Sequence, residues 1–159
     1  MRYSNAGTVL LMGEPKGKFL SGRVSGTPSP GTNMQIKATA FIGGKPVWEV
    51  AAPSGGDGKP CLIAILVEDF DQGKGISDAY VSGTECQVYC PIAGEDMLVR
   101  VGEGGGTSNT LAIGDLVMSD AEDGIFVPNS SGTSVPWQVC ETVTQQADTT
   151  LVWCKYTGH

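Results

Sequence analysis

The sequence predicts an all-β protein, a small antiparallel β-barrel or β-sandwich with a loop-rich N-terminal arm. Two observations support this prediction. The 159 residues include 23 glycines and 9 prolines, and only 17% are charged, which is typical of short strands joined by tight turns. The apolar runs are short, and turn-forming residues separate them about every ten residues, as in a sandwich or barrel. A chain of this length buries roughly 70% of its unfolded surface, so it can fold without a metal ion or a disulfide.

The first third of the chain contains loop signals and one hairpin. Residues 17–33, GKFLSGRVSGTPSPGTN, are rich in glycine, proline and hydroxyl-bearing residues, so we expect an extended or looping stretch. In residues 34–50, apolar and polar side chains alternate on the way to Gly43 and Gly44. This pattern predicts a β-hairpin that turns at the two glycines.

The clearest internal boundary is PSGGDGKP at residues 53–60, where the charge of the chain changes sign. Residues 1–59 carry seven basic and three acidic residues, a net charge of +4, whereas residues 60–159 carry three and fourteen, a net charge of −11. We therefore divide the chain into a basic N-terminal arm with its hairpin and an acidic barrel or sandwich body. The acidic body excludes a general nucleic-acid binder. The basic segment indicates an arm that docks on an acidic surface, with a scattered, solvated set of charges as the alternative.

The predicted body begins with the most apolar run of the chain, CLIAILV at residues 61–67. Its short length and uniform apolarity predict a strand that is buried on both faces, with a helix as the alternative. Shorter strands are expected after it, at residues 79–82, 85–90, 97–101, 116–118, 125–127, 137–143 and 149–156. If the loop between the last two strands is centred on Ala147, Cys140 opposes Cys154 and Val143 opposes Leu151.

The acidic stretch IGDLVMSDAEDGIFVP, residues 113–128, has the composition of a calcium loop but not its spacing. A helix–loop–helix calcium site needs a glycine at position six and a glutamate at position twelve. Counted from Asp120, the glycine is the fifth residue and the twelfth is Ser131. Asp123-Gly124 instead predicts a hairpin turn between two strands, with weak surface binding of Ca²⁺ as a minor alternative.

The sequence contains no recognisable catalytic motif. The only histidine is His159, the last residue, which argues against Ser-His-Asp and Cys-His sites. Glu68, Asp69 and Asp71 follow the apolar run and could serve a paired-carboxylate hydrolase, but a solvated strand exit is the simpler interpretation. We therefore expect no enzyme activity, no cofactor and no metal site.

The cysteines and tryptophans are also expected to have structural roles. The five cysteines are an odd number and lie in or beside apolar runs, so free thiols are expected rather than a disulfide framework. Cys86 and Cys90 are four residues apart and face one side of a strand, where two core thiols are simpler than half of a zinc site. Trp48, Trp137 and Trp153 could form a sugar-binding platform, but each has apolar neighbours, and the core is the expected position.

The apolar runs also bear on the compartment. None reaches the roughly 20 residues that a membrane span needs. Residues 9–12 are too few for the apolar part of a signal peptide. We expect a soluble protein that is made in a cytoplasm and that contacts neither membrane nor nucleic acid.

Several short motifs follow one another in the C-terminal half: Gly114-Asp115, Asp123-Gly124, Val127-Pro128, the strand from Val139 to Val143, and Leu151-Val152. In this order they form a strand opening, a hairpin cap, a strand exit and two closing strands. The pattern resembles that of the capsid decoration, or cement, proteins of tailed bacteriophages. The resemblance covers residues 90–156 and does not extend to the first sixty residues.

The resemblance implies a non-enzymatic virion protein on the outer capsid surface. Such a protein would stabilise the shell at junctions between major capsid proteins, commonly as a homotrimer. Together with the charge division, it makes the basic residues of the arm the expected capsid contacts: Arg2, Lys16, Lys18 and Arg23. Deletion of residues 1–30 is then expected to leave a folded trimer that cannot decorate capsids.

Two other functions remain open at this point. One is a β-sandwich module that binds carbohydrate or a cell surface, such as a viral fibre head, which predicts an exposed aromatic cluster. The other is a small hydrolase that uses acidic residues, which requires two buried carboxylates converging in a cleft.

Overall fold

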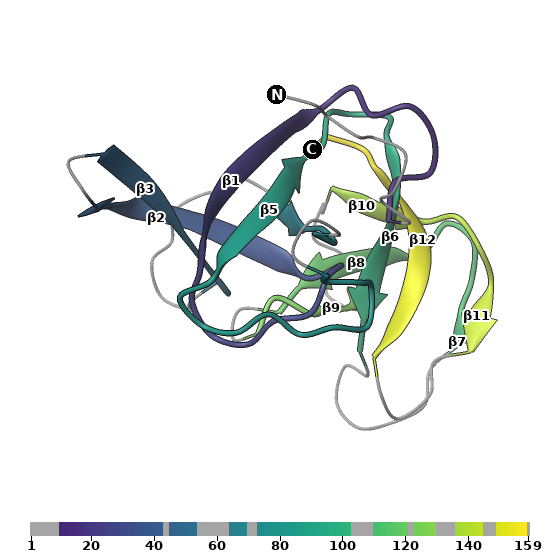
Figure 1. Cartoon of the computed structure of the whole chain (residues 1–159). Coiled ribbons are helices and arrows are strands. Elements are labelled where there is room, and N and C mark those ends of the chain that lie inside the picture. Colours follow the sequence, from purple (N-terminus) through teal and green to yellow (C-terminus); the bar gives the residue numbers. More distant parts are fainter. Residues whose placement is uncertain are drawn as a thin grey trace.

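The computed structural model shows an all-β chain built from two small barrels (Figure 1). The prediction of a small all-β barrel fold is confirmed, with two closed five-stranded barrels in place of one. No helix occurs in the described part of the chain, and hence none that could cross a membrane. The structure describes residues 10–42, 45–53, 64–69, 73–102, 110–120, 123–129, 136–144 and 149–158.

The N-terminal barrel has the strand order β1-β3-β2-β4-β5. Its strands are β1 (Lys18–Val24), β2 (Asn33–Ile42), β3 (Lys45–Ala51), β4 (Ala64–Leu66) and β5 (Glu85–Cys90). The barrel closes because β1 pairs antiparallel with β5 along its length and parallel with the end of β3. The predicted hairpin is confirmed as β2 and β3, and the end of β2 and the start of β3 project away from the other strands (Figure 1).

The C-terminal barrel has the order β10-β12-β6-β9-β8. Its strands are β6 (Asp96–Val101), β8 (Leu116–Ser119), β9 (Phe126–Pro128), β10 (Trp137–Val139) and β12 (Thr150–Tyr156). The longest ladder joins β12 to β6 over six residue pairs, from Thr150↔Val101 to Lys155↔Asp96. Two short strands, β7 (Thr110–Leu111) and β11 (Val143–Thr144), pair with each other outside the barrel.

Strand pairing crosses the boundary that the sequence predicts near residue 60. β2 pairs with β4, and β1 pairs with β5, so residues on both sides of the boundary belong to one barrel. The chain passes between the barrels after Cys90, the end of β5. The described part of the predicted arm is therefore a barrel wall, because the glycine-rich residues 17–33 include a strand with a paired neighbour on each side.

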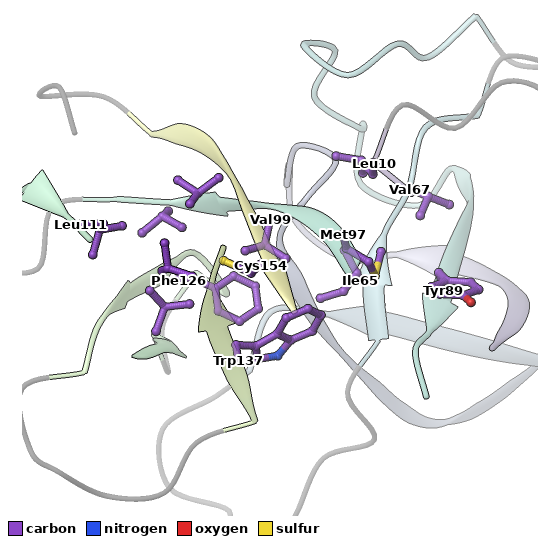
Figure 2. Close-up of a cluster of buried hydrophobic side chains, with 14 residues drawn as sticks. Leu10, Ile65, Val67, Tyr89, Met97, Val99, Leu111, Phe126, Trp137 and Cys154 are labelled. Atoms are coloured by element: carbon purple, nitrogen blue, oxygen red, sulfur yellow. The ribbon is translucent and has the colours of Figure 1, made fainter. Parts of the chain in front are cut away.

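The two barrels share a hydrophobic core, and β4 lies between its two clusters. Ala64 and Leu66 belong to the cluster inside the N-terminal barrel, whereas Ile65 belongs to the cluster that fills the C-terminal barrel. Figure 2 shows Ile65 beside Met97, which comes from β6. All three residues of β4 are fully buried. The predicted strand with two buried faces is thus confirmed, and its function is to join the barrels.

The predicted register of the last two strands is wrong by one residue. Cys154 pairs with Val139 and not with Cys140, and Val143 pairs with Leu111 of β7. Because side chains alternate between the faces of a strand, a shift of one residue exchanges the face of each partner. The sequence estimate failed because it assumed one simple loop, whereas the chain leaves β10 and forms β11 before it returns.

Candidate functional site

The N-terminal segment of the described chain lies along the C-terminal barrel. The backbone N–H of Leu98 donates to the carbonyl of Leu10 at 2.8 Å. The backbone N–H of Met12 donates to the backbone carbonyl of Asp96 at 3.1 Å. Leu11 forms an antiparallel bridge with Met97. The Leu10 side chain is fully buried in the shared core. We call residues 10–17 the strap, because they run from the C-terminal barrel to the start of β1.

A single carboxylate fastens the end of the strap. Glu95 Oε1 accepts hydrogen bonds from the backbone N–H of Lys16 at 2.5 Å and of Gly17 at 3.2 Å. The same oxygen accepts a short hydrogen bond from the Tyr89 hydroxyl. Glu95 Oε2 accepts from the Ile92 N–H at 2.7 Å. The carboxylate therefore joins the strap to β5 and to the turn that connects the two barrels.

The hydrogen bonds around Glu95 decide its protonation. Burial alone would raise the pKa of the carboxyl group, but the hydrogen bonds from Tyr89, Ile92, Lys16 and Gly17 outweigh it and lower the pKa. Burial, together with the bond to Glu95, raises the pKa of Tyr89. The pair is thus a charged acceptor and a neutral donor, which is the stronger form of such a hydrogen bond.

Arg100 of β6 makes a second link between distant segments. Its Nε donates to the carbonyl of Pro30 at 3.0 Å, and its Nη2 donates to the carbonyl of Ile76 at 2.8 Å. Its Nη1 donates to Thr149 Oγ1 at 3.2 Å. Its backbone N–H donates to the Gly31 carbonyl at 2.9 Å. Burial lowers the pKa of the guanidinium, which nevertheless remains charged at any physiological pH. Together with Glu95 it links segments of the two barrels.

The predicted capsid contacts do not form one group. Arg2 lies outside the described residues. Lys16 and Lys18 are exposed at the junction of the strap and β1, whereas Arg23 is half-buried near the other end of β1. Five residues of strand separate Lys18 from Arg23, about 17 Å at the usual rise. Of the three that the structure describes, the two lysines lie close together on the chain and Arg23 lies apart from them.

Exposed apolar residues occur on the strap and on the turn that Glu95 bonds to it. Met12 of the strap is 44% exposed, and Ile92 of the turn after β5 is 47% exposed. The strap and residues 94–96 also line a groove of about 340 Å³. We call Met12, Lys16, Lys18 and Ile92 the strap surface, since the hydrogen bonds of Glu95 hold its segments together. Two exposed apolar side chains with two cations can contact a protein partner with an acidic, partly apolar face, although the strap also carries the exposed acid Glu14.

The acidic stretch at residues 113–128 forms turns, as predicted. The Asp123 carboxylate accepts a hydrogen bond from the Ile125 N–H at 2.8 Å, and Gly124 has a φ of +76° between β8 and β9. The carbonyl of Gly124 also accepts the Asn33 N–H at 2.8 Å, so this turn joins β2 of the other barrel. Among the described residues, no group of three or more metal-ligating side chains is placed to hold an ion.

The two acidic residues that follow β4 are buried, whereas the sequence predicts that they are solvated. Glu68 and Asp69 are buried, with exposures of 3% and 6%, and do not form a solvated strand exit; Asp71 lies outside the described residues. Tyr80 is buried next to them and donates its hydroxyl to the Val67 carbonyl at 2.9 Å. Burial, followed by the charge of Asp69, raises the pKa of Tyr80. These residues form part of the interior of the N-terminal barrel.

The predicted core thiols are confirmed for one pair. Cys86 is buried and Cys90 packs against the same cluster, so both face the interior of the N-terminal barrel. Burial raises the pKa of Cys86 to about 12, so this thiol is neutral at physiological pH. Cys140 and Cys154 are free thiols on β10 and β12 or next to them, and Cys61 lies outside the described residues.

The three tryptophans occupy different environments and do not form a cluster. Trp137 is buried and packs edge-on against Phe126, with 5.4 Å between the ring centroids. Trp153 is partly buried. Trp48 is 47% exposed, which contradicts its expected core position. It lines a shallow groove of about 240 Å³ at the open end of the N-terminal barrel, together with the last residues of β1 and residues 82–83.

Sequence reasoning missed Glu95, Arg100 and the exposure of Trp48. Glu95 and Arg100 have partners about 70 to 80 residues away, which no local pattern indicates. For Trp48 a signal was present, because Lys45 and Pro46 before it and Glu49 after it interrupt the apolar run.

Comparison with known proteins gives a likeness of fold. No protein-family model matches the chain, and no curated protein is similar to it in sequence. Six chains of solved structures resemble it. One is the head fiber gp8.5 N base of bacteriophage phi29, with a TM-score of 0.53 and 12% sequence identity. The likeness covers 88% of this chain and 93% of the other, so it extends over both barrels and shows that the two proteins share this fold.

Proposed function

We propose that this chain is a non-enzymatic structural protein of a bacteriophage virion, attached to the outside of the head. The observation that carries the proposal is the likeness to the phi29 head fiber base, which extends over almost the whole length of both chains. One small barrel is common among unrelated proteins, but two barrels joined in the same way are a more specific arrangement.

The construction of the molecule supports a mechanical role. Shared core packing at β4, the Glu95 carboxylate and the Arg100 guanidinium all join segments from both barrels. A protein that withstands load on a shell needs such links between its parts and needs no reactive group. A general acid of a hydrolase needs a raised pKa, whereas that of Glu95 is lowered, so this groove-lining carboxyl group is a structural one.

We further propose that the strap surface makes the contact with the capsid. The protein binds at junctions between major capsid proteins through the strap surface, and it does so as a homo-oligomer, a homotrimer in the simplest case. The exposed Met12 and Ile92 supply apolar area, and Lys16 and Lys18 supply charge that attracts an acidic shell. A stable contact buries about 800 Å² on each partner, so neighbouring residues and further copies of the chain must add to these four.

Co-sedimentation with capsids of the cognate phage tests this surface. Met12→Asp and Ile92→Asp together, or Lys16→Glu and Lys18→Glu together, are expected to reduce binding at least tenfold. Met118→Asp and Lys37→Glu are matched controls, because these residues lie away from the strap and leave its chemistry unchanged. Undiminished binding of both double variants would refute the proposed surface, and particles without this protein would refute the virion role. Sedimentation equilibrium gives the oligomeric state.

A carbohydrate-binding or cell-surface module is the second function that the sequence suggests. The exposed aromatic cluster that it predicts is not formed, since Trp137 is buried and Trp153 is partly buried. Trp48 is exposed, but a single tryptophan does not make such a cluster.

A further inference from the structure

The two barrels have the same topology. In each, the first of the five strands pairs parallel with the third and antiparallel with the fifth, and the second and fourth strands complete the ring in the same order. The corresponding strands are β1 and β6, β2 and β8, β3 and β9, β4 and β10, and β5 and β12. The chain is therefore built from two repeats of one unit, to which β7 and β11 are added in the C-terminal barrel.

The residue registers of the two repeats also agree. If Val24 is matched with Val101, the five ladders assign further matches around each ring and lead back to the first match without a shift. The interior residues matched in this way are Val24 and Val101, Val50 and Phe126, Met34 and Val117, Ala64 and Trp137, Leu66 and Val139, and Val88 and Cys154. All of them are buried. Gly31 and Gly114 also correspond, since they precede the second strand equally and have φ angles of +93° and +97°.

Within the chain, one face of the C-terminal barrel packs on one face of the N-terminal barrel. Arg100 donates from its backbone N–H to the Gly31 carbonyl at 2.9 Å and from Nε to the Pro30 carbonyl at 3.0 Å. The Gly124 carbonyl accepts the Asn33 N–H at 2.8 Å. Pro30, Gly31 and Asn33 are all buried. This inner contact thus joins the arginine-bearing face of one repeat to the segment before the second strand of the other.

The complementary halves of the inner contact are repeated on the outside of the molecule. The corresponding residues are Arg23 for Arg100, Trp48 for Gly124, Ile113 for Pro30 and Gly114 for Gly31. Trp48 is 47% exposed, and Ile113 is 70% exposed, the largest value among the exposed apolar side chains that the structure describes. A Cβ added at Gly114 has no atom within 4 Å, whereas one at Gly31 would lie 3.2 Å from the backbone nitrogen of Arg100. Both outer faces are therefore uncovered in a single chain.

We propose that copies of this chain associate head to tail by repeating the inner contact. The face around Arg23 and Trp48 of one copy packs on residues 113–116 of the next, and Arg23 donates to the Ile113 carbonyl as Arg100 does to that of Pro30. Such a heterologous contact adds one copy after another and closes into a ring where the rotation permits. The inference names the contact between copies in the proposed homo-oligomer and rests on that part of the proposed function, but purified protein tests it without a capsid.

The outer contact differs from the inner one in two respects. A Cβ at Gly124 would lie 2.1 Å from the Asn33 carbonyl, so the tryptophan at the corresponding place holds the faces further apart and fills the space with its indole. The exposed Asp115 lies beside Gly114, and its charge complements that of Arg23, whose guanidinium forms no hydrogen bond with a described residue. Glu85, which pairs with Arg23 across β1 and β5, offsets part of this attraction.

Sedimentation equilibrium of the purified whole chain tests the contact. The unmodified chain is expected to form complexes at submillimolar concentration. Trp48→Asp on one face and Ile113→Asp on the other are each expected to weaken association at least about tenfold, because each places a charge in an apolar contact. Each variant retains the face that the other lacks, so an equimolar mixture is expected to form pairs with one copy of each. Urea unfolding checks that both exposed substitutions leave the fold intact.

Ile92→Asp is the matched control, because Ile92 is as exposed as Trp48 but belongs to the strap surface. It is expected to associate as the unmodified chain does, so association and capsid binding can fail separately. An unmodified chain that stays single, undiminished association of either variant, or a mixture without pairs would each overturn the proposal. If Trp48→Asp unfolds, Arg23→Glu tests the same face with the same expectation. Loss of capsid binding by both face variants of a chain that stays single would make these faces capsid contacts instead.

Discussion

The hydroxyl of Tyr89 donates a short hydrogen bond to the carboxylate of Glu95, and this one carboxylate also receives three backbone N–H groups. The Tyr89 side chain is part of the shared core. Glu95 lies directly before β6, the first strand of the C-terminal barrel. The pair therefore lies where the two barrels and the strap meet. Because of these bonds, we expect the stability of the folded protein to depend on the charge of Glu95.

Stability is expected to fall at acid pH because of Glu95. Its pKa is lowered in the folded protein, so its contribution is complete above the unfolded value of about 4.3 and is lost as the pH falls through the lower folded value. Glu95→Gln removes the charge, and about 2 kcal/mol of unfolding free energy is expected to be lost at pH 7. Urea unfolding of both proteins between pH 2 and 7 should show the difference shrinking below about pH 4. Glu14→Gln, in the exposed part of the strap, is the control; a difference independent of pH would contradict the assignment.

Arg100→Lys is expected to destabilise the chain although it keeps the charge. A lysine cannot reach the carbonyls of Pro30 and Ile76 and the Thr149 hydroxyl at once, so at least one buried acceptor loses its partner. The expected cost is about 1–3 kcal/mol by urea unfolding. Arg23→Lys makes the same exchange at a guanidinium that forms no such bond with a described residue, and it should change stability by less than about 0.5 kcal/mol. Equal effects of the two variants would show that the bonds of Arg100 contribute little.

Gly124→Ala tests the contact between the β8–β9 turn and the other barrel. The added Cβ would lie 2.1 Å from the carbonyl oxygen of Asn33, and the residue would also keep a φ of +76°. Gly114→Ala is the control. Gly114 also has a positive φ, +97°, but no atom lies within 4 Å of a Cβ added there. We expect the control to lose about 1–2 kcal/mol from backbone strain and Gly124→Ala to lose at least about 1 kcal/mol more. Thermal unfolding in which both variants melt together would exclude a role for this contact.

The strap gives a prediction about truncation. Deletion of residues 1–30 is not compatible with an intact fold, since it removes Leu10 from the core and β1 from the first barrel. Leu10→Ala is expected to cost about 2–5 kcal/mol, the usual range for a fully buried leucine. Met12→Ala, two residues away but 44% exposed, should cost less than about 0.5 kcal/mol. Hydrogen exchange at Leu98, whose N–H donates to the Leu10 carbonyl, should quicken only in the first variant.

Features that depend on neighbours in the chain were predictable. Side-chain alternation and two glycines identified the β2–β3 hairpin, uniform apolarity identified β4 as a strand with two buried faces, and Asp123-Gly124 identified a turn. Cys86 and Cys90 were assigned to one face because the strand repeat is two residues. These features follow from the conformational preferences of a few consecutive residues.

Features that depend on distant residues were decided only by the tertiary structure. The charge change near residue 60 suggested an arm and a body, but hydrogen-bonded ladders between β2 and β4 and between β1 and β5 join the two sides. Glu95 and Arg100 became structural centres because segments 70 or more residues away bring backbone groups to them. Local sequence determined where strands and turns form, since steric preference acts over a few residues. Which strands close each barrel, and which polar groups meet between them, depended on global packing, since buried donors and acceptors must find partners wherever the chain places them.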